Sequence, residues 1–394
     1  MRFLHTADWQ LGKPYARVTD PDKRSQLRRE RYSAIGRLGE VARQQGASFV
    51  VVAGDLFDTH QPTRADVSAA CSAIGAVGLP VLAIPGNHDH GGAGSCWQEG
   101  YFRQEAEQLA PNLTVLLERE PFELSKLGLP GGVLLPCPLL RKAEPVDPTA
   151  WLRQLVFSPW SDQPRIVLAH GSVHGFGGED TSDTDDENPP VPTNRIDLTA
   201  LPGGEIDYVA LGDWHGLKQV SARAWYSGCH EMDRFPRAAD YCSGQVLVVE
   251  VQRGAQPEVF DVRTGSVGWH QLEHRFNSDD DLERLEQILR DLIGPRSQED
   301  LLLLELEGSL SLDAAARLQE LLQRFEARLL RLKLRDRTTV APDAAELRLL
   351  TERAGDPLVA RVAQRLQQQL DQGDEESELA RMALRELHRA CVTS

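Results

Sequence analysis

The stretch "FVVVAGDLFD" (49–58) is an aliphatic run that ends abruptly in a glycine and a carboxylate, Gly54 and Asp55. A short run that is apolar on both faces is typical of a strand buried inside a layered α/β protein. Three more stretches have the same shape: "VLAIPGN" (81–87), "RIVLAHG" (165–171) and "YVALGD" (208–213). We therefore predict an α/β fold with these four runs as buried strands.

Helices are predicted between the first strands. Residues 22–46 carry apolar side chains at helical spacing and end at Gly46, and residues 65–78 begin near Thr63 or Asp66 and end at Gly78. Further along, "QVLVVEV" (245–251) and "PEVFDV" (257–262) are strand-like with no long helix between them. These two runs predict a second sheet that covers the first, so residues 1–270 are expected to form a two-sheet β-sandwich core flanked by helices.

The pattern changes near residue 271. Residues 279–294 and 311–327 are predicted helices, whereas 301–308 and 328–338 are predicted strands, which suggests a small α+β capping domain over 271–340. The strand at 328–338 alternates and places Arg331, Lys333 and Arg335 on one face. Residues 341–394 are expected to form a helical extension, with two helices broken near Gly373.

One segment, "GGEDTSDTDDENPPVPT" (177–193), is acidic, rich in proline and lacks periodicity, so it predicts a surface loop. It follows His170 closely. It would then either cover the site described below or be an inert solvated insertion.

Composition limits the possible functions. The formal net charge of −16 argues against bulk attraction to nucleic acid, so a DNA contact must be local, metal-mediated or shared with a more basic partner. The six cysteines are scattered without a C-x-x-C pair, which argues against a disulfide framework or a zinc knuckle. The start of the chain does not resemble a signal peptide, and no apolar run is long enough to span a membrane. We expect a cytoplasmic protein.

Polar residues stand at the ends of five apolar runs, where ligand sites of α/β sheets gather. They are Asp8, Gln10, Asp55, Asp58, Asn87, His88, His170, Asp213 and His215. Each alone is explained by a helix cap or a loop hydrogen bond. Together, carboxylate, amide and imidazole groups are the set that binds two divalent ions such as manganese or iron. Such a pair activates water and neutralises the charge that develops at a phosphate.

The ordered pattern D-x-Q, GDLFD, GNHD, H and GDWH resembles the calcineurin-like metallophosphoesterases, whose usual motifs are D-x-H, GD-x-x-D, GNH(D/E), H and GH-x-H. Within that family, "FLHTADWQLGK", "GDLFDTHQPT" and "YVALGDWHG" are most similar to the SbcD-type double-strand-break repair nucleases. The resemblance covers about residues 1–270.

The resemblance implies a role for each residue. Asp55 would bridge two ions, with Asp8, Gln10 and His215 completing the first site and Asn87, His170 and Asp213 the second. His88 would contact the scissile phosphate and assist departure of the leaving group. Asp58 would orient His88 and raise its pKa, or would make a loop hydrogen bond only.

Two positions depart from the family pattern, because Gln10 and Asp213 each replace a histidine. Two imidazoles are lost and one carboxylate is gained, which favours manganese, or magnesium, over zinc. The other expected ligands are all present, so we interpret the site as retuned rather than inactive.

The leading hypothesis is a two-metal-dependent DNA exonuclease or endonuclease that works as a homodimer with an SMC-like ATPase of the SbcC type. Residues 271–340 would guide DNA and the terminal helices would dock the partner. The alternatives are a phosphatase or phosphodiesterase on nucleotides or phosphoproteins, and a catalytically silent DNA-end scaffold. Possible substrate contacts are His60, His90, His174 and Arg234; His230 is expected on a loop facing the cleft and His5 in a structural role.

Overall fold

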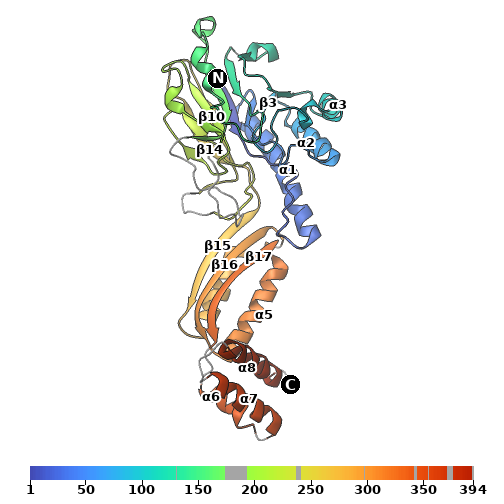
Figure 1. The fold of residues 1–394 in the computed structure, drawn as a ribbon, viewed down its shortest axis with the longest axis vertical. Coiled ribbons are helices and arrows are strands. Elements are labelled where there is room, and N and C mark those ends of the chain that lie inside the picture. The colour runs from blue at the N-terminus through green and yellow to red at the C-terminus, as the bar shows by residue number, and fades with distance from the viewer. Residues whose placement is uncertain are drawn as a thin grey trace. The chain divides into compact units, whose positions relative to one another are not determined.

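The computed structural model describes residues 1–129, 131–173, 193–236, 241–296, 298–340, 344–353, 355–370 and 376–392. It divides the chain into two compact units, Met1–Val267 and Gly268–Ser394 (Figure 1). His174 and nearly all of the predicted loop at 177–193 lie outside the described residues.

The first unit contains two six-stranded sheets. The first sheet has the order β14-β13-β1-β2-β3-β4, in which β1 to β4 run parallel and β13 and β14 are antiparallel. Its strands are β1 (Arg2–Thr6), β2 (Val50–Ala53), β3 (Val81–Ile84), β4 (Leu113–Val115), β13 (Gln245–Glu250) and β14 (Glu258–Arg263). β2 and β3 are buried on both faces, as their uninterrupted apolar runs predict.

The second sheet has the order β11-β12-β10-β7-β6-β5, with a parallel centre formed by β12, β10, β7 and β6. Its strands are β5 (Phe122–Glu123), β6 (Val133–Cys137), β7 (Arg165–His170), β10 (Tyr208–Gly212), β11 (Lys218–Gln219) and β12 (Ala224–Tyr226). Two short strands, β8 (Ser172–Val173) and β9 (Arg195–Ile196), pair with each other just beyond β7.

The two sheets pack face to face around one apolar layer that takes side chains from both, among them Phe3, Val51, Leu168 and Ala210. The outer face of the first sheet is covered by α1 (Pro21–Gln45), α2 (Arg64–Val77) and α3 (Gly100–Leu109) (Figure 1). The prediction of an α/β core with flanking helices is confirmed.

One prediction about the sheets was wrong. The runs at 245–251 and 257–262 were expected in the covering sheet, but as β13 and β14 they extend the first sheet beside β1. The covering sheet is built instead around β7 and β10, two of the strands predicted from glycine-ended runs. Pairing of β1 with β13 joins residues about 245 positions apart, which no local pattern encodes.

The helix boundaries follow local chemistry. The Asp20 side chain accepts hydrogen bonds from the first turn of α1, and Gly46 ends that helix with φ of 65°. The Thr63 hydroxyl caps α2, and Gly78 ends it with φ of 73°. The predicted helix ends at Gly46 and Gly78 are confirmed, and Thr63 rather than Asp66 begins α2.

The second unit begins with a three-stranded parallel sheet of order β15-β16-β17. Its strands are β15 (Gly268–Phe276), β16 (Asp300–Leu310) and β17 (Arg331–Val340), connected by α4 (Asp281–Ile293) and α5 (Leu312–Arg328). The inward-facing leucines of the sheet pack with both helices in one apolar core. The helices at 279–294 and 311–327 and the strands at 301–308 and 328–338 are confirmed; β15 was not predicted.

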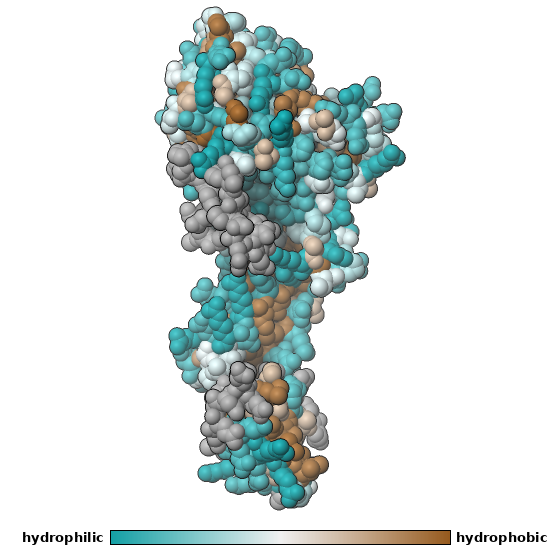
Figure 2. Space-filling model, in the orientation of Figure 1, coloured by the Kyte–Doolittle hydropathy of each residue, from teal (hydrophilic) through white to brown (hydrophobic). Residues whose placement is uncertain are grey.

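Three further helices follow, α6 (Ala344–Thr351), α7 (Pro357–Leu370) and α8 (Glu376–Val392), which share a small core with the start of α5. Their outer faces carry exposed apolar side chains, visible as brown patches in Figure 2. These side chains are Leu349, Leu358, Val362, Leu379 and Met382. No helix in the described part of the chain is both long and apolar enough to cross a membrane.

The predicted boundary at 270 falls inside β15, whereas the compact units meet at 267/268. A division of the second unit into 271–340 and 341–394, and a capping role for either part, stay predictions.

Candidate metal centre

The carboxyl ends of β1, β2 and β7 bring Asp8, Asp55 and His170 together, with ligand atoms that all lie within 4.8 Å of one another. All three side chains are almost fully buried. Since a buried carboxylate is costly unless it is paired or bound to a cation, this arrangement fits a metal centre.

Two more predicted ligands join this cluster from separate loops. The Asn87 side-chain oxygen lies 2.9 Å from His170 Nε2, and Asp213 Oδ1 lies 3.8 Å from the same nitrogen. Asp55 Oδ1 is 3.6 Å from it. Three loops therefore place a carboxylate or an amide beside one imidazole nitrogen. We call these five residues (Asp8, Asp55, Asn87, His170 and Asp213) the main cluster.

The backbone is strained where it presents these ligands. Asp8, Asp55 and Asp213 have φ values of 53°, 53° and 103°, in a region that L-residues rarely adopt. Backbone bonds hold the loops after β1 and β2 together, because Asp8 N donates to the carbonyl oxygen of Gly54 at 3.1 Å. Asp213 N donates to both carboxylate oxygens of Asp8 at 3.2 Å. Strain retained at ligand positions is typical of a functional site.

His170 is oriented by its surroundings. Its Nδ1 lies 2.8 Å from the Ala53 carbonyl oxygen, which can only accept, so Nδ1 carries a proton and Nε2 is the nitrogen that faces the cluster. The ring packs onto Gly54, where an added Cβ would lie 2.2 Å from Nδ1. A glycine is therefore required beside this ligand.

The pKa shifts show an excess of negative charge. Burial, together with the neighbouring carboxylates, raises the pKa of Asp8 to about 6 in spite of the nearby imidazoles. Burial alone would lower the pKa of His170, but Asp55, Asp8 and Asp213 outweigh it and raise that pKa to about 9. A proton held this firmly marks a position where a divalent cation fits the donor set.

Gln10 and His215, predicted for the first ion, lie at one side of this cluster. His215 Nε2 is 4.0 Å from Asp8 Oδ1 and 3.3 Å from the Gln10 amide nitrogen. The Gln10 side-chain oxygen accepts a hydrogen bond from the Lys13 ammonium at 2.6 Å. The structure thus brings both residues to the centre, but with the Gln10 oxygen turned to Lys13.

Asp233 is a buried partner that the sequence analysis did not assign. Its carboxylate accepts from Lys13 Nζ at 2.9 Å and lies 3.0 Å from His215 Nδ1. Burial alone would raise the pKa of Asp233, but Lys13, His215 and Arg234 hold it well below its ordinary value. Burial alone would lower the pKa of His215, but the Cys229 sulfur and Asp233 raise this pKa well above its ordinary value.

His215, Cys229 and Asp233 form a second group whose ligand atoms lie within 4.8 Å of one another. The Asp233 carboxylate already forms two ion pairs, with Lys13 Nζ at 2.9 Å and with Arg234 Nε at 3.3 Å. These charges repel a divalent cation, so we interpret this group as the support of His215 rather than a separate metal site.

His88 is the predicted catalytic residue and lies at the accessible edge of the main cluster. Its side chain is 39% exposed, and its Nε2 lies 4.0 Å from Asp55 Oδ2. Its Nδ1 lies 2.8 Å from the main-chain carbonyl oxygen of Asp58, so this nitrogen carries the proton and Nε2 faces outward. Asp58 therefore orients His88 through its backbone, and a role for its carboxylate stays a prediction.

Asp89 is the last residue of the GNHD motif, and no role was predicted for it from the sequence. It is fully buried and accepts from Gly86 N at 2.7 Å and from Phe57 N at 3.0 Å. Burial, with Asp55 nearby, raises its pKa to about 7. Asp89 thus ties the loop of Asp55 to the loop of Asn87.

The remaining predicted contacts fall in three places. The exposed His60 ring stacks on His90, with centroids 5.3 Å apart, and Arg234 Nη2 lies 2.9 Å from His215 Nδ1. Substrate binding by these residues stays a prediction. His230 was expected on a loop facing the cleft, which was wrong: it is fully buried, with Nε2 2.8 Å from the Arg31 carbonyl oxygen.

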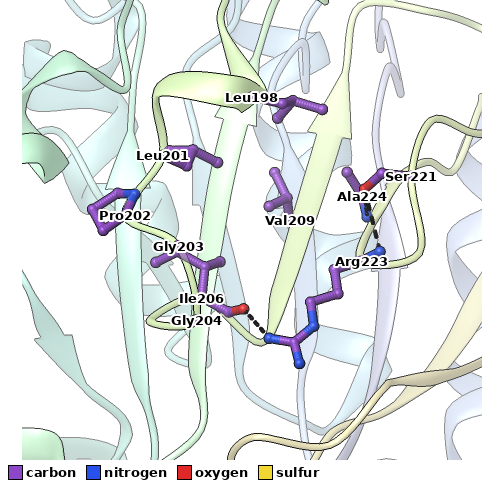
Figure 3. Close-up of a pocket in the computed structure, with 10 residues that line it drawn as sticks. All are labelled: Leu198, Leu201, Pro202, Gly203, Gly204, Ile206, Val209, Ser221, Arg223 and Ala224. Atoms are coloured by element: carbon purple, nitrogen blue, oxygen red, sulfur yellow. Dashed lines mark hydrogen bonds between the residues drawn. The ribbon is translucent and has the colours of Figure 1, made fainter.

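A cavity of about 360 Å³ lies elsewhere in the first unit, beside Val209 near the start of β10 (Figure 3). It is lined mainly by apolar residues and glycines of 198–206, and the side chain of Arg223 donates to the Ile206 carbonyl oxygen at 2.6 Å. None of the predicted ligands lines it, and the ligands follow the opposite end of β10. This cavity is not part of the metal centre.

A two-sheet α/β core with oxygen and imidazole donors gathered at its strand ends defines the class of metal-dependent phosphoesterases. The chain belongs to the calcineurin-like phosphoesterase family, whose family model matches residues 1–217, more than half of the 394 residues. Among solved structures, TT1561 of Thermus thermophilus is 12% identical, covers 67% of this chain and 98% of its own, and has a TM-score of 0.39. A second structure has the same identity and coverage and a TM-score of 0.40. The family match, and not these distant likenesses, identifies the class.

Proposed function

We propose that this phosphoesterase is a manganese-dependent DNA nuclease that hydrolyses phosphodiester bonds at DNA ends. The observation that carries the proposal is the accessible Nε2 of His88, placed 4.0 Å from a carboxylate oxygen of the buried main cluster. A phosphate held over the cluster would meet this nitrogen first.

In this proposal the bound cations, His88 and Asp89 have different roles in hydrolysis. Bound divalent cations supply water activation and neutralise charge on the phosphate. His88 is held by the Asp58 carbonyl through Nδ1, which leaves Nε2 to face a bound phosphate. We propose that Nε2 binds a phosphate oxygen and, as general acid, passes a proton to the leaving oxygen. Asp89 keeps the two loops that carry Asp55 and His88 in register.

The choice of DNA as substrate rests on the similarity of the motifs around Asp8, Asp55 and His215 to SbcD-type nucleases. Within the described part of the second unit, the exposed side of β17 carries basic side chains. Two of its arginines pair with glutamates of β16, Arg335 with Glu305 at 2.7 Å and Arg337 with Glu307 at 3.3 Å. This pairing weakens the basic face, so we propose that an SMC-like ATPase of the SbcC type supplies much of the DNA affinity to a homodimer of this chain.

The test compares substrates at fixed manganese. Linear duplex DNA, closed circular DNA, bis-p-nitrophenyl phosphate and p-nitrophenyl phosphate are incubated with the wild type, with His88→Ala and with a control, Lys126→Met, which changes an exposed lysine of the first unit outside the centre. We expect the wild type and the control to cut linear DNA, and His88→Ala to lose at least about 100-fold of that rate at an unchanged melting temperature.

Other outcomes point elsewhere. Hydrolysis of the monoester alone would indicate a phosphatase, and the nuclease proposal would be wrong. If no substrate is cut, even with the ATPase added, the chain acts as a silent scaffold. Equal loss of DNA cleavage in Lys126→Met would remove the specific role of His88.

A further inference from the structure

The two predicted cation positions differ in how their donors are already engaged. At the second position, the carboxylates of Asp55 and Asp213 and the amide of Asn87 surround Nε2 of His170. Turning the Asn87 amide would place its nitrogen 2.9 Å from His170 Nε2 and 3.0 Å from Asp55 Oδ2. The turned orientation satisfies the hydrogen bonds of the amide with these acceptors, whereas a cation among them would select the orientation that presents oxygen. Among the described residues, none holds the Asn87 amide against either turn.

Gln10 has no such freedom. An ammonium group only donates, so the Lys13 bond of 2.6 Å requires the Gln10 oxygen and turns the amide nitrogen toward His215 Nε2 at 3.3 Å. Turning the amide would set its hydrogens against those of Lys13. An amide nitrogen does not ligate a divalent cation. Gln10 therefore presents its amide nitrogen, which is not a metal ligand, to the first position.

Lys13 is itself held in place. It bonds to the fully buried carboxylate of Asp233 at 2.9 Å, and its side chain is only 21% exposed. The same carboxylate contacts His215 Nδ1 at 3.0 Å, so the ammonium and the imidazole share one anion. Lys13 adds a fixed positive charge next to the ligands of the first position, and this charge also opposes a second cation.

We infer that the two cation positions are unequal. The second position, formed by Asp55, Asn87, His170 and Asp213, binds one divalent ion tightly, whereas the hydrogen bond of Lys13 to Gln10 keeps the affinity of the first position low. This inference concerns the site on which the proposed function rests, and it deepens that proposal by making Lys13 a positioning residue that sets the number of tightly bound ions. The protein at low manganese would then carry one ion per chain and an ammonium beside it.

The experiment measures binding, not cleavage. Manganese is titrated into the metal-free full-length protein by calorimetry, and electron paramagnetic resonance is recorded at one and two equivalents. The variants are Lys13→Met, Gln10→His, the double variant, and Lys126→Met as a control that removes an exposed lysine outside the centre. For the wild type and Lys126→Met we expect one tight ion, a second at least about 10-fold weaker, and a mononuclear spectrum.

In the double variant we expect the second ion to bind at least about 10-fold more tightly and a spin-coupled manganese pair to appear at two equivalents. Two equally tight ions in the wild type would overturn the inference, whatever the variants do. A double variant that folds but keeps the weak second ion would also overturn it. If one tight ion binds and DNA is not cut, the proposed function fails alone; if DNA is cut and two equal ions bind, only this inference fails.

Discussion

The buried histidine His5 should make the stability of the first unit sensitive to acid. Its Nε2 lies 3.2 Å from the Leu211 carbonyl oxygen and its Nδ1 2.9 Å from the Tyr208 hydroxyl. The carbonyl only accepts, so Nε2 carries the proton and Nδ1 accepts from the hydroxyl. A second proton would place a positive charge inside an apolar core, and this burial lowers the pKa of His5 to about 3.

The size of the effect follows from this pKa. The unfolded ring takes up a proton near its ordinary pKa of 6.5, while the folded ring stays neutral until about pH 3. The unfolded state therefore binds more protons below pH 6.5, and stability is lost as the pH falls through this window. Between pH 7.5 and 5 the free energy of unfolding should drop by about 2 kcal/mol through His5 alone.

The assay is urea unfolding at pH 7.5 and at pH 5, followed by tryptophan fluorescence. Six of the seven tryptophans lie in residues 1–267, so the signal reports mainly on the first unit. His5→Gln should lose about 2 kcal/mol less than the wild type between the two pH values, even if it is less stable at both. His60→Gln, which changes an exposed histidine, should behave like the wild type. Equal drops in His5→Gln and the wild type would refute the account of a neutral, buried ring.

Two further predictions concern the metal centre and the second unit. Gly54→Ala should abolish tight manganese binding and lower the free energy of unfolding by about 1–3 kcal/mol, because its Cβ at φ of 92° would lie 2.2 Å from His170 Nδ1. Calorimetry measures the manganese affinity and urea unfolding measures the stability. An unchanged manganese affinity would contradict the packing argument. Gly36→Ala, at an open position of α1, is its control and should raise stability by about 0.4–1 kcal/mol. Glu346→Ala should destabilise the start of α5 by about 1 kcal/mol, since its carboxylate accepts from Leu312 N at 3.1 Å and Asp313 N at 2.9 Å. Faster hydrogen exchange in α5 is the readout, and unchanged exchange would show that this cap is dispensable.

Much of the fold was predictable because its signals are local. A run such as 49–53 is buried on both faces, and the turn that follows needs Gly54 before Asp55. The stops at Gly46 and Gly78 are equally local, because each ends a helix in a left-handed conformation. These patterns specified the strands, the helices and the place of the ligands after strand ends.

Sheet membership was not predictable, and neither was the burial of His230. The runs of β13 and β14 carry no local signal of the sheet that they join, because the place of β13 beside β1 depends on pairing with residues about 245 positions away. His230 follows a glycine and a cysteine in a segment without periodicity, so nothing near it indicates that its ring packs 5.4 Å from Trp9. Long-range pairing and packing decide such positions.

The sequence by itself determined which donors this centre has: carboxylates, amides and imidazoles, in order, each after a buried strand. Only the tertiary structure decided which atom each donor presents. The Asn87 amide can turn either end to His170, whereas Gln10 has its oxygen held by Lys13, which in turn is held by Asp233, 220 positions away along the chain. The physical reason is that an amide is oriented by the partners at its two ends, and those partners come together only when the chain has folded.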